Sequence, residues 1–193
     1  MATPLESRRI VIAGASSLLG AELKSLLEES RFAASDFRLV DEENAAGTLT
    51  EAGGEAAVIR PVEEDSFDKA WIVFFAGSAW FTKTNLPLAQ RSGARMIDLS
   101  SELAGQSGVT TWLPRFSGNA AAAQTNVFAI PSAHAEIIAR LSTALQSLNP
   151  SALSAVAFQP VSAAGKSGIE ELESQTGQPG EDRVDVQPKD VGR

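Results

Sequence analysis

A short apolar run that ends at a glycine and leads into an amphipathic helix is the feature that most restricts how this chain can fold. Residues 9–13 read RIVIA and precede Gly14, and residues 18–27 place five leucines on one helical face. Glu22, Lys24 and Glu28 lie on the opposite face. A β-branched apolar run of this kind is typical of a strand buried on both faces, as strands of a parallel sheet are. The segment therefore predicts a buried strand followed by a helix that packs on its sheet.

The same alternation of strand and helix continues over most of the chain. Further strands are predicted at residues 37–43, 55–62, 70–77, 94–101 and 126–131. Helical patterns are clearest at residues 79–92 and 133–148. Strands that alternate with helices pair in parallel through right-handed crossovers. The sequence therefore predicts an α/β fold, a doubly wound (Rossmann-type) parallel sheet, over residues 1–131.

The pattern changes after Pro150. Residues 152–175 read as an apolar strand, a turn of small residues and the start of a helix. We expect residues 132–176 to form the start of a second, α+β domain. Residues 177–193 are rich in glycine, proline and charge without periodicity, which predicts a loop or a disordered tail.

Composition excludes several classes of function. The chain has no cysteine, which rules out disulfides, thiolate metal sites and a cysteine nucleophile, and its single histidine leaves no metal site to predict. A net charge of -8 without a basic stripe argues against nucleic acid or an anionic membrane as a partner. No apolar run is long enough to span a bilayer, and the first residues do not read as a signal peptide. We therefore expect a cytoplasmic protein.

The turn between the first strand and the first helix has the spacing of a phosphate-binding turn. Residues 14–20 read GASSLLG, so Gly14 can make the tight turn and Gly20 can let the helix pack closely on the sheet. Ser17 stands where a glycine would let the backbone approach a pyrophosphate. Two interpretations remain open: a nucleotide-binding turn, or a turn that kept its shape and binds nothing.

An acidic residue ends the second predicted strand. Asp41 lies 21 positions after Gly20, where a dinucleotide fold places the carboxylate that binds the ribose hydroxyls of NAD. Glu42 and Glu43 add negative charge that would repel the 2′-phosphate of NADP, so NAD is the favoured cofactor. The alternative is a solvated acidic loop.

Four segments together resemble a known family. Residues 10–23, 74–83, 93–101 and 158–172 are similar, in order and spacing, to segments of aspartate-semialdehyde dehydrogenases and related semialdehyde dehydrogenases. The resemblance runs from about Arg9 to Gln175. It implies a nucleotide-binding domain, a catalytic and dimerisation domain, and NADPH-dependent reduction of an acyl phosphate to an aldehyde. The cofactor cleft implied by the resemblance is lined by Gly14, Ser16, Ser17, Gly20, Ala76, Gly77, Ser78 and Ser100, with Gly165 and Lys166 closing over it.

The residues that carry the family's chemistry are replaced. The resemblance implies a cysteine thiolate that attacks the substrate carbonyl, in a motif Asn-Pro-Asn-Cys at the start of a helix. Here Pro131 matches, Ser132 stands for the second asparagine, and Ala133 stands for the cysteine. Ala104 stands where an arginine would hold the substrate, whereas Gln159 is retained as part of the framework.

Two functions follow from these departures. The first is a non-catalytic member of an NAD(P)-dependent oxidoreductase family of amino-acid biosynthesis, which acts as a binding or assembly module and pairs with a second copy or an intact relative. The second is an active aldehyde or acyl-phosphate oxidoreductase whose missing catalytic residues lie outside this chain. Ser132 beside His134 does not suit a catalytic pair, because side chains two apart at a helix start diverge, so Ser132 is predicted to cap the helix.

Aromatic residues are expected mainly in the core. A buried strand followed by a helix start explains a cluster made of Trp71, Phe74, Phe75, Trp80 and Phe81. Trp112 and Phe116 lie in a predicted loop and are the better candidates for an interface.

Overall fold

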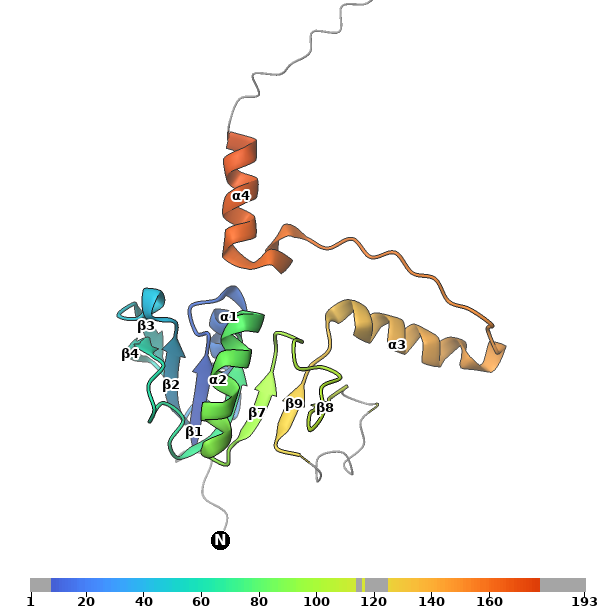
Figure 1. Cartoon of the computed structure of the whole chain (residues 1–193). Coiled ribbons are helices and arrows are strands. Elements are labelled where there is room, and N and C mark those ends of the chain that lie inside the picture. The colour runs from blue at the N-terminus through green and yellow to red at the C-terminus, as the bar shows by residue number, and fades with distance from the viewer. Residues whose placement is uncertain (1–7, 114–115, 117–124, 178–193) are drawn as a thin grey trace, which may run out of the picture. The chain divides into compact units, whose positions relative to one another are not determined.

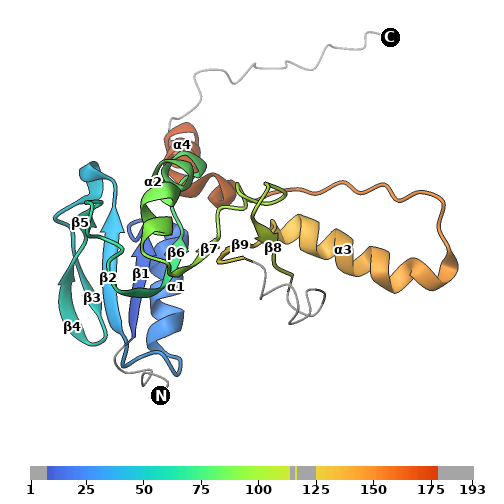
Figure 2. The ribbon, with the colours of Figure 1, turned by 60° about the horizontal axis from the view of Figure 1, so that its bottom comes forward.

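A seven-stranded parallel sheet forms the centre of the first of two units into which the chain divides, Met1–Ala157 and Phe158–Arg193. The computed structural model describes residues 8–113, 116 and 125–177. All ladders of this sheet are parallel, as predicted. Its strands are β1 (Arg9–Ala13), β2 (Asp36–Asp41), β5 (Arg60–Pro61), β6 (Ala70–Phe75), β7 (Arg95–Asp98), β8 (Thr110–Thr111) and β9 (Val127–Ala129) (Figure 1; β5 and β6 are labelled in Figure 2).

The strand order places a topological switch point beside β1. The order is β5-β2-β1-β6-β7-β9-β8, so the chain leaves β1 on one side through β2 and then returns to its other side with β6. Ala13 at the end of β1 aligns with Val40 of β2 and Phe75 of β6. In parallel sheets of this kind the crevice at such a point, at the carboxyl ends of the strands, is where ligands bind.

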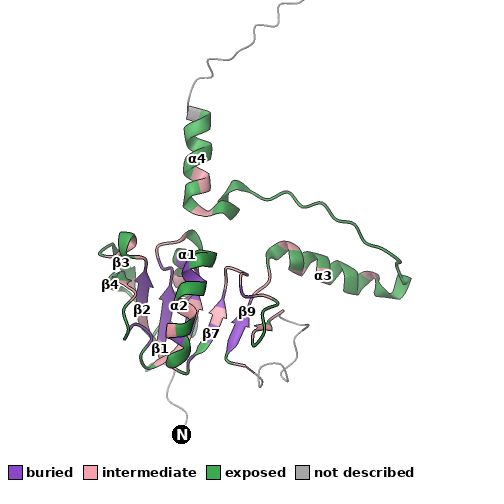
Figure 3. Ribbon diagram, in the orientation of Figure 1, coloured by how far each residue is buried: buried purple, intermediate pink, exposed green. Residues whose placement is uncertain are grey.

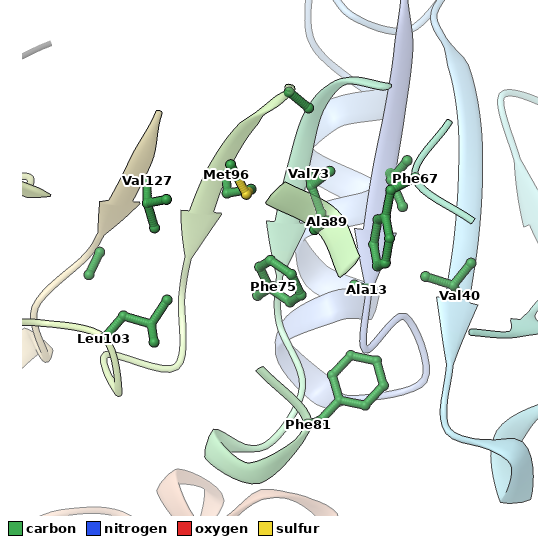
Figure 4. Close-up of a cluster of buried hydrophobic side chains, with 13 residues drawn as sticks. Ala13, Val40, Phe67, Val73, Phe75, Phe81, Ala89, Met96, Leu103 and Val127 are labelled. Carbon is green, nitrogen blue, oxygen red and sulfur yellow. The ribbon is translucent and has the colours of Figure 1, made fainter. Parts of the chain in front are cut away.

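Alternation along the strands fills a core on each face of the sheet. Val11 and Ala13 belong to one buried cluster, whereas Ile10 and Ile12 belong to another, as expected when successive side chains point to opposite faces. Helix α2 (Ala79–Arg91) contributes Phe81 to the first cluster (Figure 4). Helix α1 (Leu18–Glu28) contributes Leu27 to the second. Helices therefore cover both faces, and the predicted doubly wound fold is confirmed.

The expectation of a single strand over residues 55–62 is wrong. Strand β3 (Leu49–Ala52) and strand β4 (Glu55–Val58) form a separate antiparallel hairpin, whereas β5 joins the main sheet. Gly53 and Gly54 form the turn with φ values of +64° and +81°, which a two-residue hairpin turn requires. The hairpin lies beyond β2 in both views (Figure 1 and Figure 2).

Helix α3 (Ala133–Leu145) continues into a 3-10 turn, η4 (Gln146–Leu148), which confirms the helix predicted over residues 133–148. The cap is also confirmed, because the Ser132 hydroxyl accepts a hydrogen bond from Ala135 N at 3.3 Å. No residue of α3 is buried, and Ile137 and Leu141 are about half exposed (Figure 3). In this unit, α3 therefore presents an uncovered apolar face.

The strand expected after Pro150 is not formed. Residues 152–160 pair with no strand in the described part of the chain, and a strand exists only through its ladder of hydrogen bonds. The second unit contains the 3-10 turn η5 (Val161–Ala164) and helix α4 (Gly165–Gly177), so the predicted helix start is confirmed. The boundary predicted between residues 131 and 132 stays a prediction. The predicted tail lies outside the described residues, apart from Gly177.

The expectation that the aromatic cluster is buried is wrong at one position. Phe75 and Phe81 are buried, but Trp80, in the first turn of α2, is 67% exposed. Trp112 is half buried and packs edge-on against Phe128, with ring centroids 6.0 Å apart.

Among the described helices, none combines the length and apolar character that crossing a membrane requires.

Candidate functional site

Two turns touch at the switch point. One follows β1 and contains Gly14, and the other follows β6 and contains Gly77. A Cβ atom added to Gly14 would lie 2.2 Å from Gly77 N, and one added to Gly77 would lie 2.7 Å from the Phe81 ring. Gly14 also has a φ of +89°, which favours glycine. Packing of turn on turn therefore accounts for these glycines, whether or not a ligand binds.

The Ser17 side chain links the same two turns. Its hydroxyl donates a hydrogen bond to the carbonyl oxygen of Ala76 and accepts one from Gly20 N, both at 2.8 Å. Ser17 is thus the N-cap of α1, a position for which serine is among the preferred residues. Ser78 caps α2 in the same way by accepting from Phe81 N at 3.1 Å.

A hydrogen bond to the Asp41 side chain links the end of β2 to the turn after β1. Its Oδ2 accepts a hydrogen bond from Ser16 N at 2.7 Å, and its Oδ1 accepts one from Glu42 N at 2.8 Å. The residue is 6% exposed. A carboxylate accepts about four hydrogen bonds, so these two amides leave acceptor capacity for a ligand hydroxyl. The ribose-binding role of Asp41 is compatible with this geometry and stays a prediction.

An acidic cavity of about 660 Å³ opens beyond the ends of β2 and β5, beside α2. Four carboxylates line it: Asp41, Glu42, Glu43 and Glu63. Its other lining residues carry no charge: Asn44, Pro61, Val62, Trp80, Phe81, Thr84 and Asn85. The sequence reasoning missed Glu63 and Trp80. The signal for Glu63 was its place just after an apolar run, since parallel strands end at one edge of the sheet.

A buried carboxylate organises the turn after β7. Asp98 is fully buried, and its side chain accepts hydrogen bonds from Ser100 N at 2.8 Å, the Ser100 hydroxyl at 2.6 Å and Leu103 N at 2.9 Å. The hydroxyl of Ser100, a residue predicted to line the cofactor cleft, therefore donates a hydrogen bond to Asp98. An ion pair between Lys83 and Glu102 ties the turn to α2. Nothing in the sequence distinguished Asp98 from an ordinary residue at a strand end.

The position implied for the nucleophile begins α3, after β9. Ala133 is the first helical residue and is exposed, directly after the capping Ser132. Ala104, at the position implied for the arginine, is half buried and packs against the hydrophobic core. Neither side chain has a polar atom that can attack or bind a substrate.

The predicted site residues fall into two groups. Those at the carboxyl ends of β1, β2, β6 and β7 belong to the first unit and lie along one edge of the sheet: Gly14, Ser16, Ser17, Gly20, Asp41, Ala76, Gly77, Ser78 and Ser100. The others belong to the second unit: Gln159, Gly165 and Lys166. The part of both groups in a cofactor site stays a prediction.

Comparison with known proteins finds relatives that include aspartate-semialdehyde dehydrogenases. Aspartate-semialdehyde dehydrogenase 2 of Vibrio cholerae is 24% identical over 170 residues, which cover 86% of this chain and 50% of that protein. The USG-1 protein homolog of Azotobacter vinelandii is 28% identical over 174 residues, with the same two shares covered. The chain spans about half the length of the curated relatives it matches.

Solved structures share the fold. The crystal structure of aspartate semialdehyde dehydrogenase II from Vibrio cholerae, complexed with ASA, has a TM-score of 0.72 at 24% identity. The match covers 94% of this chain and 56% of that chain. Aspartate semialdehyde dehydrogenase from Francisella tularensis has a TM-score of 0.71 at 19% identity, with 88% and 49% covered. The sequence profile described as "Semialdehyde dehydrogenase, NAD binding domain" matches residues 9–140. This chain belongs to the semialdehyde dehydrogenase family and carries its NAD-binding domain.

Proposed function

We propose that this chain binds NAD at the carboxyl edge of its sheet and does not carry out the acyl transfer that the family resemblance implies. The observation that carries the proposal is Ala133 at the first residue of α3, in a chain of 193 residues that has no cysteine. A methyl group cannot form an acyl-enzyme, because covalent catalysis requires a nucleophilic atom. Ser132 does not replace it, since its hydroxyl caps the helix.

The turns after β1 and β6 support nucleotide binding. The first keeps the spacing and the positive φ of Gly14 that a phosphate-binding turn needs, and it sits at the switch point of the sheet. Asp41 reaches the adjoining cavity, where it has acceptor capacity for ribose hydroxyls. A nicotinamide dinucleotide is therefore the ligand class that this edge suits best.

The charge of the cavity favours NAD over NADP. Four carboxylates line it, and none of the described lining residues is basic. Like charges about 4 Å apart repel by roughly 1 kcal/mol in water and about 4 kcal/mol near a protein surface, and a 2′-phosphate would meet several of them. A bound 2′-phosphate also needs a cationic partner, which Asn44 and its acidic neighbours do not supply.

The substrate side of the proposed site lacks its anchor. An arginine binds carboxylate or phosphate through two parallel hydrogen bonds, and Ala104 makes neither. The absence of this arginine and of a nucleophile supports a role in binding or assembly. In such a role the chain keeps its nucleotide-binding residues without the residues that catalyse the reaction.

A second candidate rests on the length of the relatives. Because this chain matches about half of them, an active aldehyde or acyl-phosphate oxidoreductase would need catalytic residues supplied from outside this chain. Such an enzyme would also need a nucleophile other than the side chain of Ala133.

A turnover assay tests the first candidate. The protein is incubated with aspartate semialdehyde, phosphate and either NAD or NADP, and reduced cofactor is followed by absorbance. We expect no steady rate above that of buffer. Ala133→Cys is expected to restore little, because Ala104 still leaves the substrate unanchored. A steady rate from the unchanged chain would contradict the first candidate.

We also propose that the chain associates with a second copy through its uncharged segment. Residues 151–162 contain no charged side chain, and Val156 and Phe158 are 85% and 92% exposed. Extended apolar segments without charge tend to pair with another chain.

Light scattering at several concentrations tests this association. Val156→Asp with Phe158→Asp should weaken it, whereas Leu49→Asp, which changes an exposed leucine of the hairpin, should not. A monomer at every concentration would rule out the homodimer and leave pairing with an intact relative to be tested by mixing.

A further inference from the structure

We propose that Ser17 limits the affinity of the turn after β1 for a nucleoside diphosphate, because its hydroxyl occupies an amide that a phosphate would otherwise bind. This inference rests on the proposed nucleotide-binding function and identifies the residue that sets its strength. Ser17 stands at the position where the backbone of such a turn approaches a pyrophosphate.

The Ser17 hydroxyl is held from both sides. It accepts from Gly20 N and donates to the Ala76 carbonyl oxygen, at 2.8 Å each. The first contact satisfies one of the amides at the start of α1 that have no partner within the helix. The second fixes the hydroxyl against the turn after β6. A phosphate oxygen that binds the Gly20 amide must therefore displace a hydroxyl that is already engaged twice.

Most other amides of the turn are also satisfied by the protein itself. Gly14 N and Ala15 N donate to the Val40 carbonyl oxygen, and Ser17 N donates to that of Gly14. Ser16 N donates to the carboxylate of Asp41. Leu18 N and Leu19 N are the first two amides of α1, and amides at these positions have no acceptor within a helix. A phosphate thus finds fewer donors here than the spacing of the turn suggests.

Among these internal acceptors, Ser17 is the one that can be removed with the least disturbance. The Asp41 carboxylate is buried and charged, and the Val40 and Gly14 acceptors belong to the backbone. The Ser17 hydroxyl is neutral and sits on a single rotatable bond. Glycine is itself accepted at an N-cap position with little loss of helix stability, so Ser17→Gly frees the amide and also removes the Cβ atom.

The test compares ADP with adenosine by NMR titration of ¹⁵N-labelled protein, using wild type, Ser17→Gly and Ser17→Ala. We expect Ser17→Gly to lower the Kd for ADP about tenfold, which corresponds to about 1.4 kcal/mol and to the scale of one hydrogen bond to a charged group. Ser17→Ala should give a smaller gain, because its methyl group still stands near the phosphate. Adenosine has no phosphate, so its Kd should not change. The Gly20 amide resonance should move with ADP in Ser17→Gly.

Ser132→Gly is the matched control, since it removes the N-cap serine of α3, and it should leave the Kd for ADP unchanged. The dispersion of the amide spectrum verifies that each variant is folded. An unchanged Kd for ADP in both Ser17 variants, or an equal gain for adenosine, would overturn the inference and leave the proposed function standing. If neither wild type nor the Ser17 variants bind ADP or NAD, both the inference and the proposed function fail.

Discussion

At the scale of single residues, glycines and buried carboxylates determine the geometry of the candidate site. Gly14 and Gly20 were predicted from the sequence as the residues of a tight turn. The contact of Gly14 with Gly77 was not, because it joins turns that are 63 residues apart in the sequence. Asp98 escaped prediction for a similar reason, since its burial depends on the turn that closes over it.

Gly14→Ala is expected to destabilise the fold strongly. The new Cβ would lie 2.2 Å from Gly77 N at a φ of +89°, so overlap and backbone strain add. We expect the free energy of unfolding in urea to fall by about 3 kcal/mol. Gly54→Ala is the matched control, because its φ is +81° with no atom within 4 Å, and it should cost about 1 kcal/mol. Equal losses would show that the two turns do not touch as described.

Asp98→Asn tests the buried carboxylate. An asparagine side chain keeps one acceptor oxygen but presents an NH₂ group to donors that Asp98 now satisfies, from Ser100 and Leu103. We expect the free energy of unfolding to fall by about 3 kcal/mol, as for a buried group left without its hydrogen bonds. Asp68→Asn, at an exposed position, should change it by less than about 0.5 kcal/mol. A negligible effect of Asp98→Asn would contradict the burial of this carboxylate.

At the scale of elements, hydrophobic periodicity predicted the central strands and all the long helices of the first unit. Hydrophobic periodicity failed where a strand forms only by pairing with another strand. Residues 55–62 looked like one apolar run, although the Gly53-Gly54 pair that precedes them is a known hairpin signal. Residues 152–160 have the composition of a strand, but no described strand pairs with them. Trp80 was misplaced because an apolar residue at a helix start need not face the sheet.

Helices α2 and α3 offer a comparison at equal length, since each has 13 residues. Helix α2 buries Phe81, Thr82 and Ala89, whereas α3 buries none of its residues. Isolated helices shorter than about 12–15 residues are marginal in water, so α3 should open readily. In hydrogen exchange followed by mass spectrometry of dilute protein, we expect α3 to exchange far faster than α2. Equal protection would mean that the apolar face of α3 is covered in solution.

At the scale of the whole molecule, the candidate site is a product of topology. Asp41 and Glu63 lie in separate segments of the sequence, and the cavity beside α2 exists because β2 and β5 are neighbours in the sheet. The sequence predicted Asp41, Glu42 and Glu43 as an acidic group, since they are consecutive. It did not predict that a fourth carboxylate and an exposed tryptophan would complete the lining. The positions implied for the substrate-binding arginine and the nucleophile, Ala104 and Ala133, were predicted only through the family resemblance.

Calorimetric titration with NAD and with NADP tests the central claim, a nucleotide-binding domain whose acidic cavity selects the cofactor. We expect NAD to bind and NADP to bind at least about tenfold more weakly, which corresponds to about 1.4 kcal/mol of repulsion between the 2′-phosphate and the carboxylates. Glu63→Gln should narrow this difference, because Glu63 lines the cavity and glutamine removes its charge. Tighter binding of NADP, or no heat with NAD, would show that the acidic cavity does not select NAD in this way.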